Sequence, residues 1–587
     1  MSYKPPVADQ IFALETFADL KGLSDLPGLE AATPDVVAAI LAEAGKFTGE
    51  VLAPTNRLGD VQGAVWDDGS VRIPEAIRQA CRDYAAGGWA GACAPEAYGG
   101  LALPFTVGAA VTEQMTAANM ALSVGLMLSQ GAIEALTDAG SVEQRQTYLP
   151  KLISGEWWGT MNLTEPQAGS DVGALRTEAV PAPDGTYRIK GQKIFISWGE
   201  HDCADNIVHL VLARIAGAPA GTKGVSLFVA PKFLPDAAGK PGRRNDVRCL
   251  SIEHKLGIHA SPTCTMAFGE DGDCVGYLVG REHGGMATMF LMMNRTRINT
   301  GIQGIGVAER AYQAAAAYAG QRVQSAKAGA PVAIVEHADV RRMLLTMKAM
   351  VEAGRALVCF TGAAIDRAHH ARDETDRAAA RGRADLLTPM VKALGSEIGV
   401  SMSDLAIQVF GGMGYVEETG VAQYLRDARI APIYEGTNGI QAQDLVGRKL
   451  AQDGGRHWMA LVDEIEQFAT GLPRTSLAFA LLAAAERLRT SIDWLSSAKS
   501  SADDRAAGSS PFLRQFALTV CGYLMARQAL AAVERADQDG QSDFLAAKLV
   551  TARYFIDQIL PETLGLSVQA CSGAALLYAL SSDQLVA

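Results

Sequence analysis

The chain has 587 residues, of which 49% are hydrophobic and 20% charged, so we expect a globular protein with several cores. Its length predicts roughly three or four domains. The net charge of -12 argues against partners that require basic patches, namely nucleic acid and anionic membrane surfaces.

The cysteines and the first residues predict a cytoplasmic protein. The nine cysteines show no CxxC pair and no metal-like spacing to histidine, which favours free, reduced thiols and no metal site. The N-terminal residues contain Asp9 and Glu15 and lack an apolar signal segment. No apolar run approaches the ~20 residues needed to span a bilayer, so we expect no membrane segment.

Residues 1–157 are predicted to form a helical domain. Thr33 and Pro34 resemble an N-cap followed by proline at the first helical position. Apolar residues then recur with the spacing of an amphipathic helix, from Val37 to Ala44. Further helices are expected at about 72–86, 105–121 and 142–153.

Residues 158–283 are predicted to form a β domain, because short β-rich runs alternate with Gly, Pro and Asp, as in antiparallel strands. Long helices rich in Ala, Leu and Met follow over 284–452. A further helical domain is expected over 453–587, after the pair Gly454 and Gly455 and with a break at SSADDRAAGSS. The predicted fold is therefore mainly α, with a central antiparallel β-barrel or sandwich and an extra C-terminal helical domain.

Two glycine-rich segments resemble nucleotide fingerprints but lack the preceding strand that such a motif needs. Gly301, Gly304 and Gly306 lie inside a helical pattern, where small residues permit close helix packing. The segment FGGMGYV also follows a predicted helix. A nucleotide would thus be bound by a different architecture.

Four other segments contain residues that bear on function. MNLTEPQAGSDVGA (161–174) would form a tight loop whose hydroxyls and bare N–H groups suit a phosphate or a flavin edge. QKIFISWG alone is a half-buried strand, and Arg322 in YAGQRVQ would lie on the solvated face of a helix. In IAPIYEGTNGIQAQD, Glu435 lies in a loop before a helix that Thr437 could cap, where a glutamate is usually exposed.

Taken whole, these segments and QVFGGMGYVEETGVAQYLRDARI (408–430) resemble the signatures of the acyl-CoA dehydrogenase family, over about residues 50–450. Asn162, Gln423 and Gly439 depart from the family pattern. Because the family often has Gln or Glu at the position of Gly439, we expect one flavin contact to be missing there.

The resemblance implies that the cofactor is FAD. It places the following residues at the flavin of the same chain: Leu163, Thr164, Gly169, Ser170, Phe195, Ser197 and Thr437. It implies that other residues serve the FAD of a neighbouring subunit: Arg322, Gln324, Gln408, Gly411 and Gly412. The protein should therefore be a homo-oligomer, and we favour a dimer because the C-terminal block could cover the surface that smaller relatives use to form tetramers.

The resemblance also implies the reaction, an α,β-dehydrogenation of an acyl-CoA. Glu435 would remove the α-proton while flavin N5 accepts the β-hydrogen as hydride, with Arg297 as structural or electrostatic support. Some family branches place the base where this chain has Thr296, so no rival base is visible. Burial should raise the pKa of Glu435, and an electron-transferring flavoprotein should accept the electrons.

The chain most resembles a larger-chain branch of the family that acts on a short β-methylthio acyl-CoA. This resemblance rests on the chain length, the segment YEGTNGIQA and the C-terminal block. Another short- or medium-chain substrate, or an acyl-CoA oxidase, remains open. DNA-binding alkylation-response relatives share the fold but have a basic C-terminal domain. Residues 456–587 contain 11 Lys and Arg against 14 Asp and Glu, a net charge of -3, which argues against that alternative.

Overall fold

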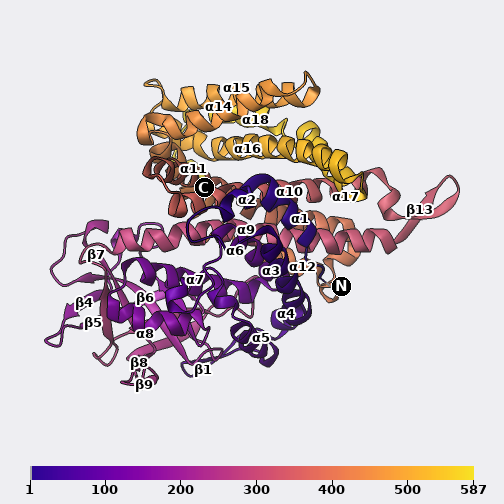
Figure 1. Ribbon diagram of the computed structural model, residues 1–587. Coiled ribbons are helices and arrows are strands. Elements are labelled where there is room, and N and C mark those ends of the chain that lie inside the picture. Colours follow the sequence, from indigo (N-terminus) through magenta and orange to yellow (C-terminus); the bar gives the residue numbers. More distant parts are fainter. Residues whose placement is uncertain (1–2) are drawn as a thin grey trace.

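The computed structural model describes residues 3–587 and has the predicted order of helical, β, helical and helical blocks (Figure 1). The exact domain boundaries stay predictions. The N-terminal block contains a small hairpin of β1 (Val65–Asp67) and β2 (Ser70–Arg72) beside its α-helices. Its α-helices are α1 (Val7–Ala13), α2 (Leu20–Ser24), α3 (Pro34–Phe47), α4 (Ala53–Gln62), α5 (Glu75–Ala86), α6 (Phe105–Ala118), α7 (Met120–Ala139) and α8 (Val142–Ile153).

The β block is one eight-stranded sheet and a short hairpin, at the lower left of Figure 1. Its strands are β3 (Trp157–Asn162), β4 (Glu178–Pro181), β5 (Tyr187–Ser197), β6 (Asn206–Ile215), β7 (Val225–Pro231), β8 (Phe233–Pro235), β9 (Pro241–Arg244), β10 (Val247–Ile252), β11 (Thr263–Phe268) and β12 (Val275–Val279). The expectation of antiparallel strands throughout is wrong, because β3 and β4 both pair parallel with β6. Parallel pairing needs a long crossover, and residues 163–205 provide one between β3 and β6.

Three long helices cross the middle of the molecule: α9 (Gly285–Gln321), α10 (Ala338–His370) and α11 (Glu374–Phe410) (Figure 1). Glycines let α9 and α11 pack backbone against backbone. A Cβ added at Gly304 would lie 2.0 Å from the Gly395 carbonyl oxygen, and one at Gly301 would lie 2.2 Å from that of Val391. The first glycine-rich segment therefore serves helix packing, as predicted.

Two local predictions are wrong. The helical pattern expected over 284–452 is interrupted after Arg322, because β13 (Val323–Lys327), which contains Gln324, and β14 (Ala330–Ala333) form a hairpin. Its two-residue turn, Ala328-Gly329, has positive φ at both positions, as tight hairpins require. SSADDRAAGSS does not break the helical block beyond Ser501: a capping box of Ser501 and Asp504 starts a helix there.

The C-terminal block packs above the long helices in Figure 1. Its α-helices are α14 (Arg456–Gly471), α15 (Ser476–Ser496), α16 (Ala502–Asp539), α17 (Asp543–Tyr554), α18 (Glu562–Ala570) and α19 (Ser582–Val586). Two helices of the described chain, α7 and α16, are long and apolar enough to cross a membrane, but 83% and 72% of their apolar windows are buried inside the protein. The cytoplasmic location stays a prediction.

A buried ion cluster joins α6 to the long helices α9 and α10. Arg355 on α10 donates to Glu113 on α6 and, at 2.8 Å, to Glu309 on α9, and all three side chains are at most 9% exposed. Charges removed from water need such pairing, because an unpaired buried charge carries a large desolvation cost.

We expect Arg355→Met to lower the stability of the folded protein by about 3–5 kcal/mol, because it leaves two buried carboxylates without their cation. The midpoint of thermal unfolding measures the effect. Arg82→Met is the matched control, since Arg82 pairs with Glu75 on the surface, and it should change the midpoint little. Equal midpoints for the two variants would contradict this account.

Candidate active site

The Glu435 loop connects α12 (Val421–Ala428) to α13 (Asn438–Asp444). Glu435 has φ 57° and Gly436 has φ 85°, and the left-handed conformation costs energy at a residue with a side chain. The predicted cap is confirmed, because Thr437 Oγ1 accepts from the N–H of Ile440 at 3.2 Å. The N–H of Asn438 donates to the Pro432 carbonyl at 3.1 Å and closes the loop.

The expected rise in the pKa of Glu435 is present. Burial raises the pKa of this half-buried carboxyl to about 7, and the positive charges of Lys392 and Arg297 oppose that rise. A carboxylate with this pKa is largely protonated below pH 7 and largely ionised above it. It can therefore accept a proton near neutral pH, as a general base must.

Lys392 on α11 is a further site residue that was not identified from the sequence. Its side chain is fully buried, and its Nζ donates to Asn438 Oδ1 at 2.9 Å, three residues after Glu435. Burial lowers the pKa of Lys392 to about 7, and the charge of Glu435 opposes this change. A lysine inside the apolar run TPMVKALG, where a charge is rarely buried alone, was the only signal in the sequence.

Arg297 on α9 also lies close to the loop. A Cβ added at Gly436 would be 3.8 Å from its Nε and Nη2 atoms. The guanidinium is buried, donates to Asn294 Oδ1 at 3.3 Å, and leaves Nε without a hydrogen-bond partner among residues 3–587. The adjacent Thr296 is also buried, and its hydroxyl donates to the Met292 carbonyl of the same helix. Arg297 thus contributes positive charge and an available donor.

The loop that contains Thr164 and Ser170 is fixed to strand β5 by a buried ion pair. Glu165 and Lys193 lie 2.8 Å apart, and Lys193 Nζ also donates to the Leu163 carbonyl at 3.0 Å. Burial would raise the pKa of Glu165, but Lys193 and the hydrogen bonds donated by the Thr177 hydroxyl and the Arg176 N–H lower it to about 2. This pair fixes the loop on the strand that bears the predicted flavin contacts.

Phe195 and Ser197 lie at an irregular part of β5, where the register with β11 shifts. Phe195 has φ 59°, and 59% of its side chain is exposed. Such a conformation is costly in a strand, so the turned-out ring is a candidate ligand contact. Ser170 and Gly169 are exposed, and a Cβ at Gly169 would meet no described atom within 4 Å.

The remaining predicted residues lie together at another place. Tyr318 near the end of α9 stacks on Phe410 at the end of α11, with ring centroids 4.1 Å apart. Arg322 and Gln408 are consequently at the same end of the helix pair, and both are exposed. Gly411 ends α11 with φ 61°. From Arg297 to Arg322 the helix rises roughly 37 Å, so this group is far from Glu435 in the same chain.

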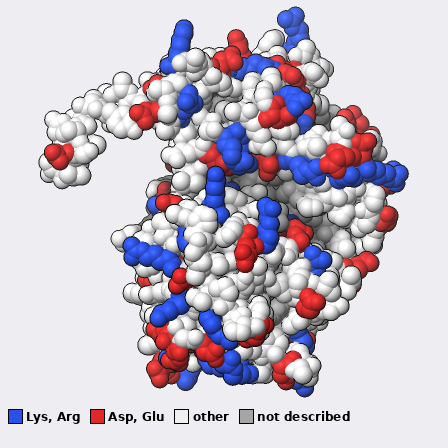
Figure 2. All heavy atoms as spheres, turned by 90° about the vertical axis from the view of Figure 1, so that its left-hand side faces the viewer, with Lys and Arg blue, Asp and Glu red and all other residues white. Residues whose placement is uncertain are grey.

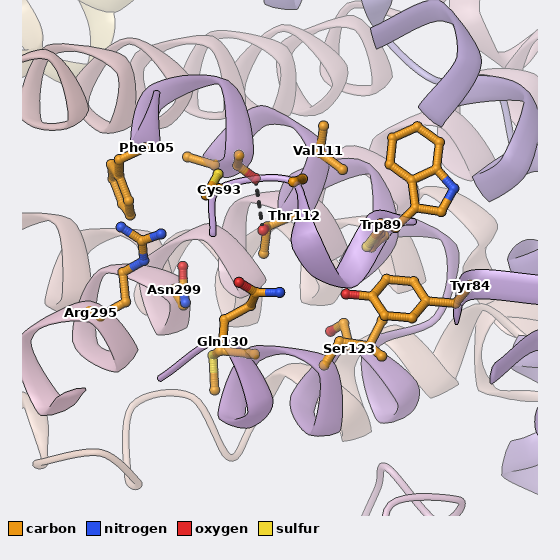
Figure 3. A pocket seen from close by; sticks show the side chains of 16 residues that line it. Tyr84, Trp89, Cys93, Phe105, Val111, Thr112, Ser123, Gln130, Arg295 and Asn299 are labelled. Atoms are coloured by element: carbon orange, nitrogen blue, oxygen red, sulfur yellow. Dashed lines mark hydrogen bonds between the residues drawn. The ribbon is translucent and has the colours of Figure 1, made fainter. Parts of the chain in front are cut away.

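A separate cavity of about 50 Å³ lies between α6, α7 and α9 (Figure 3). Its lining includes Arg295, which pairs with Glu134 and lies over the ring of Phe105. Side chains two positions apart on an α-helix are rotated by ~200° about its axis, so Arg295 and Arg297 point to opposite sides of α9. None of the predicted site residues lines this cavity, and we assign it no role in the chemistry.

Comparisons with known proteins agree with this arrangement. Family models match 38–156 as the acyl-CoA dehydrogenase N-terminal domain, 160–270 as the middle domain and 283–450 as the C-terminal domain. A fourth model, described as acetyl-CoA dehydrogenase C-terminal like, matches 461–581. The chain therefore belongs to the acyl-CoA dehydrogenase family. It is an FAD-dependent oxidoreductase that acts on acyl-CoA.

Individual relatives share nearly the whole length. The chain is 45% identical to 3-methylmercaptopropionyl-CoA dehydrogenase of Ruegeria pomeroyi, over 96% of this chain and 97% of that protein. It is 35% identical to a broad-specificity linear acyl-CoA dehydrogenase, FadE5, of Mycobacterium tuberculosis, over 95% and 96%. The structure of Caenorhabditis elegans ACDH-11 in complex with C11-CoA has a TM-score of 0.79 at 18% identity, over 99% and 96%, which shows the shared fold.

We expect Lys392→Met to raise the pKa of Glu435 above about 7, moving its titration midpoint up by about one pH unit, because a nearby positive charge favours the carboxylate. Infrared spectroscopy of the Glu435 carboxyl group against pH measures the midpoint.

The matched control for this test is Lys449→Met. Lys449 is also buried with a lowered pKa, but its Nζ donates to the Asp385 carbonyl, and its charge does not contribute to the pKa of Glu435. An unchanged midpoint in Lys392→Met, or an equal rise in the control, would show that Lys392 does not set this pKa.

Proposed function

We propose that this chain converts 3-methylmercaptopropionyl-CoA to 3-methylthioacryloyl-CoA, with Glu435 as the base. The observation that carries the catalytic part is the Glu435 loop, where burial raises the pKa of a half-buried carboxyl to about 7 and the charges of Lys392 and Arg297 oppose that rise. The substrate rests on the 45% identity to the Ruegeria pomeroyi enzyme of that name. Dehydrogenation of another short- or medium-chain acyl-CoA is the alternative, in view of the FadE5 relative.

The thioester carbonyl makes the Cα–H of the substrate acidic enough for a carboxylate to remove. Glu435 accepts this proton, and its own backbone N–H donates to the carbonyl oxygen, stabilising the charge that develops there. Arg297 stabilises the ionised form of Glu435 through its charge. When bound, FAD supplies the hydride acceptor for the hydrogen that leaves Cβ.

The residues fit this cofactor in two groups. Thr164, Ser170, Phe195 and Ser197 belong to the loop and strand that the Glu165–Lys193 pair joins. Arg322, Gln324, Gln408, Gly411 and Gly412 belong to the far end of the helix pair, where a Cβ at either glycine would meet no described atom within 4 Å. Because α9 rises roughly 37 Å between Arg297, beside the Glu435 loop, and Arg322, we propose that the second group serves the FAD of a neighbouring copy, in a homodimer.

An electron-transferring flavoprotein is the proposed acceptor of the electrons, and the cytoplasm the proposed location. An acyl-CoA oxidase would use the same base but reduce oxygen, so oxygen consumption without another acceptor would identify it. A DNA-binding role finds no support in the acidic balance of residues 456–587.

Glu435→Gln should keep the fold and the FAD but slow flavin reduction by the substrate at least ~10²–10⁴-fold, the usual contribution of a positioned base. In the unchanged protein the rate should rise with pH through about 7, as Glu435 loses its proton. Stopped-flow absorbance under anaerobic conditions measures both.

Glu418→Gln provides the control, because Glu418 is exposed on the short helical turn that precedes α12, and the rate of this variant should be unchanged. Thr296→Glu added to Glu435→Gln should restore part of the rate if both positions face the same Cα. A Glu435→Gln protein that reduces flavin at the original rate would disprove the assignment of the base.

With a panel of acyl-CoA thioesters, 3-methylmercaptopropionyl-CoA should give the highest kcat/KM and yield the 3-methylthioacryloyl thioester. Steady-state kinetics with an artificial electron acceptor measures the ratios. A kcat/KM at least ~100-fold higher for butyryl-CoA, about 2.7 kcal/mol in transition-state binding, would refute the substrate while leaving the reaction intact.

A further inference from the structure

The C-terminal arm, residues 575–587, leaves the body of the protein with its apolar side chains exposed. Figure 2 shows an arm that projects from the upper part of the molecule and is uncharged except for acidic atoms near its tip. This matches the arm's sequence, whose only charged residue is Asp583. Leu576 is 85% exposed and Val586 is 84% exposed. Large apolar side chains gathered in one exposed segment indicate a binding surface rather than a chance distribution.

The arm is fixed at its base and has local structure of its own. The N–H of Ala574, which is buried, donates to Asp504 Oδ1 at 2.7 Å, and Asp504 belongs to the capping box of α16. At the tip, Ser581 and Gln584 form a second capping box that starts α19. The arm therefore has a defined direction away from its own chain.

The apolar surface continues from the arm onto α18. Leu564 and Val568 are four residues apart, so they lie on one helix face, and both are exposed. The exposed apolar set of α18 and the arm is Leu564, Val568, Leu576, Leu577, Tyr578, Leu580, Leu585 and Val586.

The area of this surface favours a second copy of the chain as the partner. A large apolar side chain presents roughly 60–120 Å², so the partly exposed set of α18 and the arm offers roughly 350–650 Å². A stable interface buries about 800 Å² on each partner. Reciprocal exchange of arms reaches that value, because each chain then contributes its own arm and also the surface that receives the other arm. A partner that received one arm alone would fall short of it.

We propose that the C-terminal arm is exchanged between two copies of this chain, in a two-fold symmetric dimer where each arm covers apolar surface of the other copy. This goes beyond the proposed reaction. It adds a contact to the proposed dimer without involving any residue of the catalytic loop.

The test compares the FAD-loaded full chain with a triple variant, Leu576→Ser, Leu577→Ser and Tyr578→Ser. Sedimentation velocity over a range of micromolar concentrations should show a dimer for the unchanged chain, and a dimer dissociation constant raised at least ~100-fold in the variant. Val142→Ser is the control, because Val142 is 62% exposed on α8, and it should stay dimeric. Circular dichroism and FAD content establish that every chain is folded.

A photo-crosslinking residue in place of Leu585 should form a crosslink between two chains. A mixture of isotope-labelled and unlabelled copies shows that this crosslink joins different copies. An unchanged dissociation constant in the triple variant would overturn the proposal. A monomeric unchanged chain would also overturn it, and binding of that monomer to phosphatidylcholine vesicles through the arm would show that the arm contacts a membrane instead. Glu435→Gln should lose flavin reduction and remain dimeric, so failure of the arm and failure of the catalytic proposal are distinguishable.

Discussion

The close approach of α9 and α11 determines the geometry of the catalytic region. Backbone contact between two helices requires residues without side chains where they cross, and four glycines meet this requirement: Gly301, Gly304, Gly395 and Gly399. At these positions any Cβ would overlap the facing helix. Because the contacts advance in the same direction on both helices, the helices are parallel. Arg297 and Lys392 consequently approach the Glu435 loop from two different helices.

The protonation of Glu435 depends on the balance between burial and these two charges. Burial disfavours the carboxylate, whereas Lys392 and Arg297 favour it, and the result is a pKa of about 7. Burial alone would give an acid that rarely ionises at neutral pH, and closer ion pairs would give a carboxylate too weak as a base. Neither cation forms an ion pair with Glu435 within 4 Å among the described residues. Moderate distance preserves basicity while permitting ionisation.

The sequence predicted the order of the blocks and the cap at Thr437, because these features depend on local patterns. Glu435 was recognised through the family resemblance, since a loop glutamate has no pattern of its own. Lys392 was missed because its role depends on a contact with Asn438, 46 residues away. The parallel pairing of β3 with β6 was missed for the same reason, since strand partners depend on the path of the connecting chain. The two-residue turn at Ala328-Gly329 was visible in the sequence but was overlooked within a helical pattern.

The distance along α9 has a thermodynamic consequence for the proposed dimer. If the residues near Arg322 bind the cofactor of the neighbouring copy, each FAD contacts two chains, and cofactor binding and association become linked equilibria. Any interaction that favours the dimer then also favours retention of FAD, although it lies far from the flavin. Exchanged C-terminal arms would be such an interaction. The apolar arm residues could thus affect the cofactor without touching it, because they would keep the second half of its binding site within reach.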